Sequence, residues 1–120
     1  MDMLTQMFEL QDTFEKRFFD FKNMDDDEKR HLAIEFIGHI YEELAEVRAE
    51  IPLRKHWKKD GEVNRRKLKL EIVDVFHFLI TLCLIFDINV DEIYETFLHK
   101  HQVNIDRQEK LGYGKDKKKL

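Results

Sequence analysis

Two acidic pairs, each with its members three residues apart, are the residues of this chain that could do chemistry. Glu43 and Glu46 form the first pair, and Glu71 and Asp74 form the second. Residues three apart share one face of a helix, so each pair points two carboxylates the same way. Two such helices packed together would gather four carboxylates, which cannot all stay ionised without cations between them. Carboxylate oxygens suit hard divalent cations such as Mg²⁺, and Mg²⁺ held in this way commonly works on phosphates.

The two pairs differ in how well another explanation accounts for them. Glutamates such as Glu43 and Glu46 are also common on a solvated helix face. Glu71 and Asp74 instead interrupt an apolar run, where an unpaired buried carboxylate is costly, and salt bridges to Lys or Arg are the alternative there. Three further residues are candidates for outer contacts with the site: Glu42, Glu50 and His77. For His77 a histidine of the core is the preferred reading, and contact with the site is the alternative.

The composition limits the kinds of protein that this chain can be. The chain has 120 residues, 38% of them charged, with a net charge of −4, so nothing marks a nucleic-acid binder. We expect one domain over residues 1–113 and a basic, flexible tail over residues 114–120. A single Cys, no recognisable signal peptide and no apolar run long enough for a bilayer predict a cytoplasmic protein with no membrane partner.

The elements that would position the acidic pairs are helices, because apolar residues recur at helical spacing and only one Pro and four Gly occur. We expect an all-α bundle of four to five helices. The predicted helices run from Met3 to about Phe21, from Asp25 to about Ile51, from about Asn64 to Phe86, and from Asp91 to Gly112. The second half of the third helix is apolar nearly all round, which predicts burial against a neighbouring subunit.

Two further features could contact a ligand. Lys100, Asn104 and Arg107 form one polar stripe on the fourth helix and could hold phosphate oxygens, although an exposed helix end has the same pattern. Trp57 lies in the basic loop between the second and third helices. It could fill the core, lie in an interface or cover a nucleobase.

These motifs resemble the dimeric all-α dUTPases of the all-α NTP pyrophosphatase superfamily, which also contains MazG-like enzymes. That superfamily has E-x-x-E on one helix and E-x-x-D on the next, as at Glu43/Glu46 and Glu71/Asp74. The resemblance spans about residues 7–113. It also covers the segment Met7–Asp12, similar to an opening L-F-x-x-Q element, the run Asp74–Phe78, similar to D-x-x-H-F, and the segment Lys100–Tyr113, similar to K-x-x-x-N-x-x-R-Q-x-x-x-G-Y.

The resemblance implies a Mg²⁺-dependent dUTP diphosphatase that releases dUMP and pyrophosphate after water attacks the α-phosphorus. Glu43, Glu46, Glu71 and Asp74 would hold two or more Mg²⁺ ions, for which Mn²⁺ could substitute, with Glu43 or Glu46 activating the water. The stripe on the fourth helix would hold the phosphates. Gln11, Trp57 and Phe78 would contact the base. The resemblance further implies a homodimer, with a tetramer as the alternative.

Other readings stay open. The family often has Asn or Asp a turn after the Gln, where Phe14 and Glu15 stand here, so base selectivity is open. A MazG-like or dCTP-type pyrophosphatase acting on other or modified nucleotides is the nearest alternative. From another class, the chain could be a noncatalytic helical interaction module with an acidic face. A di-iron carboxylate bundle ranks last, because its Glu-x-x-His motif is missing from the acidic cluster.

Overall fold

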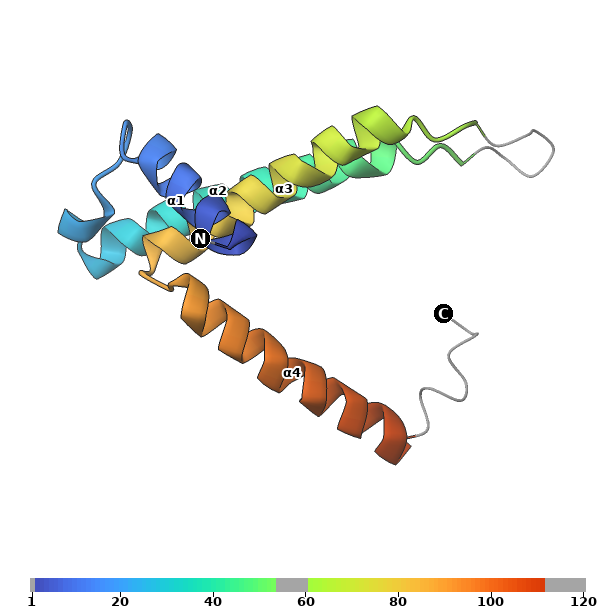
Figure 1. Cartoon of the computed structure of the whole chain (residues 1–120). Coiled ribbons are helices and arrows are strands. Elements are labelled where there is room, and N and C mark those ends of the chain that lie inside the picture. Colours follow the sequence, from blue (N-terminus) through green and yellow to red (C-terminus); the bar gives the residue numbers. More distant parts are fainter. Residues whose placement is uncertain (1, 54–60, 112–120) are drawn as a thin grey trace. The chain divides into compact units, whose positions relative to one another are not determined.

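The structure, a computed structural model, is all-helical and describes residues 2–53 and 61–111. The order of elements in this part of the chain is α1 (Met3–Glu15), the 3-10 turn η1 (Phe21–Asn23), α2 (Asp26–Ala49), α3 (Arg65–Ile85) and α4 (Val90–Leu111) (Figure 1). The predicted all-α class is confirmed. The chain divides into two compact units, Met1–Asp87 and Ile88–Leu120, and each is described by itself. The predicted tail, residues 114–120, lies outside the described residues.

An antiparallel pair of long helices, α2 and α3, forms the frame of the first unit (Figure 1). The start of α2 is fixed by a capping box, in which the Asp25 side chain accepts from the Glu28 amide and the Glu28 side chain accepts from the Asp25 amide. The Asn64 side chain caps α3 by accepting from the Lys67 amide. These caps define where α2 and α3 begin.

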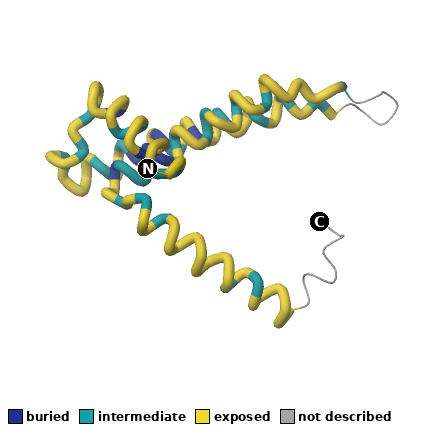
Figure 2. The backbone as a smooth tube through the Cα atoms, in the orientation of Figure 1, coloured by how far each residue is buried: buried dark blue, intermediate teal, exposed yellow. Residues whose placement is uncertain are grey.

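The core of the first unit lies near the end of this pair where α1 packs on α3. Buried residues gather there, whereas the other half of the pair is exposed or half-buried (Figure 2). Ala33, Phe36 and Ile85 form the buried cluster. Half-buried apolar side chains pack against it, namely Phe19, Phe21, Leu32, Phe78 and Leu82. From α1, Phe8 is buried as well, and burial of this side chain holds α1 against the hairpin.

The first helix is shorter than predicted, ending at Glu15 instead of near Phe21. The amides of Phe18 and Phe19 both donate to the Glu15 carbonyl, which closes a turn. The ring of Phe19 then stacks on Phe21 at 5.7 Å and meets Phe36 edge-on at 6.1 Å between ring centroids. A continued helix would carry these rings away from the core, so tertiary packing outweighs the helical spacing of the apolar residues.

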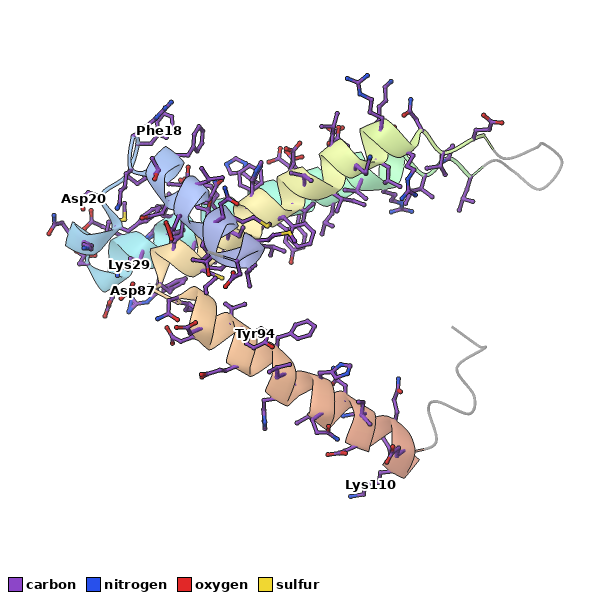
Figure 3. All side chains as sticks on the ribbon, in the orientation of Figure 1. Phe18, Asp20, Lys29, Asp87, Tyr94 and Lys110 are labelled. Atoms are coloured by element: carbon purple, nitrogen blue, oxygen red, sulfur yellow. The ribbon has the colours of Figure 1, made fainter. Side chains whose placement is uncertain are left out.

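The junction between the units begins at Asp87, whose φ of 55° lies in the left-handed region that Asp tolerates better than most residues (Figure 3). The predicted cap of the fourth helix, Asp91, is wrong by two residues. The Asn89 side chain accepts a hydrogen bond from the Glu92 amide, and the Glu92 side chain accepts one from the Asn89 amide. Every described residue of α4 is at least partly exposed. Among the described helices, none combines the length and apolarity needed to cross a membrane.

Candidate active site

Three carboxylates from the two helices of the hairpin converge on one spot. Glu43 comes from α2, and Glu71 and Asp74 come from successive turns of α3. One oxygen of each lies within 4.8 Å of one oxygen of each of the others. All three residues are half-buried. The i,i+3 spacing on α3 and the antiparallel packing of α2 thus produce the arrangement that the sequence predicts for these three residues.

The electrostatics of this carboxylate group favour a cation. Partial burial, and then the charges of Asp74, Glu46 and Glu42, raise the pKa of Glu43 above its ordinary value. Burial also raises the pKa of Glu71, and the charges of Glu46, Asp74, Glu43 and Glu50 add to that shift. Each raised pKa reports that the negative form is disfavoured where it stands. A bound cation would reverse that preference.

The donor set fits Mg²⁺, because it consists only of carboxylate oxygens on the described residues that converge here. Glu46 is exposed and lies outside the group of three whose oxygens meet. Its charge nevertheless raises the pKa of both Glu43 and Glu71, so it belongs to the same electrostatic site. The structure therefore brings three of the four predicted ligands into contact distance and leaves the fourth at the edge.

A pocket of about 880 Å³ adjoins the carboxylates, a volume that suits a small organic ligand. Its wall is mostly apolar, with a few polar side chains that include two of the three carboxylates. The apolar lining consists of Met7, Leu10, Phe14, Val73, Phe76, Phe78 and Ile80, and the polar lining consists of Gln11, Glu15, Glu43, Asp74 and His77. A ligand in this pocket would lie against α1 and α3 while touching Glu43 and Asp74.

Gln11, predicted to contact a base, lies in this pocket with its amide orientation fixed. Its Nε2 donates to the Thr81 hydroxyl at 3.0 Å, and that hydroxyl donates to the His77 carbonyl at 3.1 Å. A hydroxyl has one proton, so once Thr81 donates to His77 it can only accept from Gln11. The Gln11 Oε1 is thereby left as the acceptor available to an occupant of the pocket.

Phe78 and His77 occupy different surroundings. The Phe78 ring packs into the core, 5.7 Å from the ring of Phe36, and stacks on His39 at the same distance while also lining the pocket. His77 is exposed, with its Nδ1 4.0 Å from Asp74 Oδ1. It is placed to steady Asp74 and is not the core histidine that was the alternative.

For several predicted residues the structure gives no position relative to this pocket. Lys100, Asn104 and Arg107 are exposed on α4, which belongs to the second unit. Trp57 lies outside the described residues. Of the candidates for outer contacts, Glu42 pairs with His39 at 3.1 Å. Glu50 acts on the site only through its charge.

Sequence reasoning missed Glu15 and Thr81 as candidates for the site. Glu15 is 4% exposed, and its Oε2 has no hydrogen-bond partner among the described residues. Burial raises its pKa, and the Thr81 hydroxyl, which can turn its one proton from the His77 carbonyl to Glu15, opposes that shift. A signal existed for Glu15, because it stands four residues after Gln11 and so shares its helix face. Thr81 gave none, since a Thr among apolar residues looks like ordinary core.

The fold and site define an all-helical protein with an acidic, cation-compatible centre beside an apolar pocket. A family model described as dUTPase matches residues 3–88, and the chain therefore belongs to the all-α dUTPase family. The matched range contains both acidic pairs, Gln11, Glu15 and Thr81, and it ends before Lys100. Neither a curated protein nor a solved structure matches the chain.

Proposed function

We propose that this protein is a Mg²⁺-dependent dUTP diphosphatase, converting dUTP and water to dUMP and pyrophosphate. One observation carries the proposal: Glu43 and Asp74 belong both to the carboxylate group and to the wall of the pocket that Gln11 lines. A ligand lying in the pocket therefore reaches the acidic centre without leaving it. Membership of the dUTPase family supports a nucleotide as that ligand.

The metal would be held by Glu43, Glu71 and Asp74, with Glu46 completing the set from the edge. When bound, Mg²⁺ would neutralise phosphate charge and make a water molecule easier to deprotonate. Glu43 belongs both to the carboxylate group and to the wall of the pocket, and its raised pKa suits a group that accepts a proton from water. We assign it the role of orienting and deprotonating the attacking water, with Glu46 as the other candidate.

Different parts of the chain would contact the base and the phosphates of the nucleotide. The apolar wall of the pocket, with Phe78, would contact the flat faces of the base, and Gln11 would accept from its edge. Lys100, Asn104 and Arg107 remain proposed phosphate contacts that rest on the resemblance of their spacing. Trp57 likewise remains a proposed base contact.

Product analysis with purified protein tests the proposal. Each dNTP and dUTP is incubated with and without Mg²⁺, and the products are separated by ion-exchange chromatography. We expect Mg²⁺-dependent release of dUMP and pyrophosphate from dUTP, in preference to the other nucleotides. Glu71→Gln should lower kcat by about two orders of magnitude or more, since it removes one charged oxygen donor from the acidic centre.

Glu35→Gln is the matched control, because Glu35 is an exposed glutamate of the same hairpin, away from the carboxylate group. It should leave the rate unchanged. Preferred cleavage of dCTP or of a modified nucleotide would support the catalytic role of the acidic centre and contradict the assignment of dUTP as the substrate. A folded protein that cleaves no nucleotide would rule out the enzyme and favour an acidic binding surface.

A further inference from the structure

The first helix is held on α3 by a small contact that contains a carboxyl group. Of the residues of α1, Phe8 and Glu15 are the buried ones. Its other large apolar side chains, such as Leu10 and Phe14, are exposed. A glutamate is seldom buried in this way, because it loses its hydration when the helix packs against its neighbour. The packing of α1 on α3 is therefore sensitive to the charge state of one residue.

Glu15 has few polar neighbours for a carboxylate that is removed from water. It is 4% exposed, its Oε2 has no hydrogen-bond partner among the described residues, and its polar neighbour on α3 is the Thr81 hydroxyl. That hydroxyl has one proton, which the His77 carbonyl also accepts at 3.1 Å. An ionised carboxylate accepts through both oxygens, so one shared donor leaves most of its capacity unmet. The neutral acid needs less, and burial therefore favours it.

Charged side chains from α2 and α3 line the same pocket as Glu15. Glu43 and Asp74 carry charges like that of an ionised Glu15, and His77 can carry the opposite charge. The Nδ1 of His77 lies 4.0 Å from Asp74 Oδ1, so the charge of a protonated ring lies beside that carboxylate. Burial raises the pKa of Glu15, and the Thr81 hydroxyl opposes that shift. Loss of water, rather than a charged neighbour, therefore ties the proton of Glu15 to the packing of α1.

The two cations that follow Glu15 in the chain have other partners. The Lys16 Nζ pairs with Asp12 Oδ2 at 3.0 Å. The Arg17 guanidinium lies over the ring of Phe14, 5.9 Å from its centroid. Among the described residues, no ion pair includes Glu15. These cations therefore do not replace the water that Glu15 loses.

We propose that α1 is a proton-dependent wall of the pocket: it packs on α3 while Glu15 is neutral, and loss of that proton releases α1 and opens the pocket. Met7, Leu10 and Phe14 of α1 line the pocket, so release of the helix removes one side of it. This inference goes beyond the proposed function and does not depend on it, because it concerns only how the wall is held.

The sign of the pH dependence follows from proton linkage. Below the ordinary pKa of 4.5, Glu15 is neutral whether α1 is packed or released, and packing is strongest. Between 4.5 and the raised pKa, packing of α1 takes up one proton, so its equilibrium constant falls by up to about tenfold per pH unit. Above the raised pKa the carboxyl is ionised in both states, and the constant no longer changes.

Hydrogen–deuterium exchange of the full chain, resolved by peptide mass spectrometry, tests the inference. An isolated helix of 13 residues is marginal in water, so the amides of α1 should exchange whenever the helix is released. Exchange is measured from about pH 4 to about pH 8, and each rate is divided by the intrinsic rate at that pH. We expect the protection of α1 relative to the α2 segment around Ile40 to fall by about tenfold or more across this range.

Two variants of Glu15 remove the titrating proton. Glu15→Gln has nearly the same shape and cannot ionise, so the relative protection of α1 should stay constant across the pH range. Glu15→Met, apolar and of similar length, should behave in the same way, and it takes the place of Glu15→Gln if that variant fails to fold. Glu9→Gln is the matched control, because Glu9 is an exposed glutamate of the same helix, and it should keep the wild-type fall.

Three results would overturn the inference. The first is a relative protection of α1 that does not change with pH in the wild-type protein. The second is an equal fall in the wild-type protein and Glu15→Gln, which would assign the pH dependence to other carboxyls. The third is exchange of α1 at the intrinsic rate at every pH. Nucleotide cleavage is not part of this measurement, so a protein that fails to cleave dUTP would contradict the proposed function alone.

Discussion

At the scale of single residues, the carboxylates that would hold the metal also destabilise the metal-free protein. Glu43 and Glu71 both have raised pKa values, mainly from burial and then from neighbouring carboxylates. A glutamate with a raised pKa releases its proton less readily in the fold than in the unfolded chain. Its ionisation therefore removes stability as the pH rises from the ordinary value of 4.5 through the raised value. The metal-free protein should therefore lose most of this stability at pH values above the raised pKa.

Replacing Glu71 with glutamine should therefore stabilise the metal-free protein while it abolishes activity. Glu71→Gln should raise the Tm by a few degrees at pH 7.5 in the presence of a chelator, because it removes one member of a repelling set. The gain should vanish below pH 4.5, where the wild-type carboxyls are protonated. Differential scanning calorimetry across this pH range measures both.

Glu35→Gln should show no such gain at either pH. Added Mg²⁺ should raise the Tm of the wild-type protein and have a much smaller effect on Glu71→Gln, because only a state that binds the ion is stabilised by it. An equal Mg²⁺ response in the two proteins would contradict a metal site at these carboxylates.

Thr81 gives a second prediction at this scale. Thr81→Val has nearly the same shape but lacks the hydroxyl that holds Gln11 and the His77 carbonyl. We expect the KM for dUTP to rise by about tenfold with a smaller change in kcat, because the base contact is weakened while the acidic centre is intact. Steady-state kinetics measures KM and kcat separately.

Thr81→Ser keeps the hydroxyl and should restore KM to within about threefold of the wild-type value. A Thr81→Val variant that lowers only stability, with KM unchanged, would leave Thr81 as a packing residue.

At the scale of the elements, a capping box stabilises the start of α2, the helix that carries Glu43. The capping box of Asp25 and Glu28 satisfies two backbone amides that would otherwise lack partners. Asp25→Ala should lower the free energy of unfolding by about 1 kcal/mol, and Asp25→Asn should retain most of the capping. Urea denaturation of the three proteins, followed by circular dichroism at 222 nm, gives these differences.

Equal stability of Asp25→Ala and the wild-type protein would show that packing of the Phe36 region alone fixes the start of α2. The same comparison made by enzyme assay is expected to show little change, since the cap lies far along the helix from Glu43.

At the scale of the whole molecule, a large amount of apolar surface lies open on the single chain. On α3, Leu70, Val73, Phe76 and Leu79 are exposed. On α4, Phe97 and Leu98 are exposed, as is Tyr94 (Figure 3). Exposed apolar surface of this extent is uncommon on a monomer and is typical of an interface. It supports the predicted neighbouring subunit, which rests on the second half of the third helix being apolar nearly all round.

We expect a homodimer, with a mass of twice 14.7 kDa in sedimentation equilibrium. Phe97 is 65% exposed. Phe97→Lys should shift the equilibrium towards the monomer if α4 contributes to the interface, since a charge would be buried on association. Thr96→Lys is the control, because Thr96 is an exposed neighbour of Phe97, and it should leave the mass unchanged. A wild-type monomer at all concentrations would contradict the predicted dimer.

The sequence by itself determined the all-helical fold and the pairing of the acidic residues. Spacing of three residues is a property of the helix, so Glu71 and Asp74 share a face wherever that helix packs. The caps at Asp25 and Asn64 are equally local, because a cap needs only its own first turn. The end of the first helix was not predicted, because the Phe19 and Phe21 rings respond to contacts with Phe36 that spacing along the chain does not encode.

Only the tertiary structure decided what surrounds the pocket. The bond from Gln11 to Thr81 joins residues 70 positions apart, and the orientation of the Gln11 amide follows from it. The burial of Glu15 has the same origin, since a glutamate on an amphipathic helix is exposed until another helix covers it. Local spacing places carboxylates on one face of a helix. The packing of α1 against α3 decides which of them are removed from water. Removal from water shifts their pKa and so determines their charge and what they can bind.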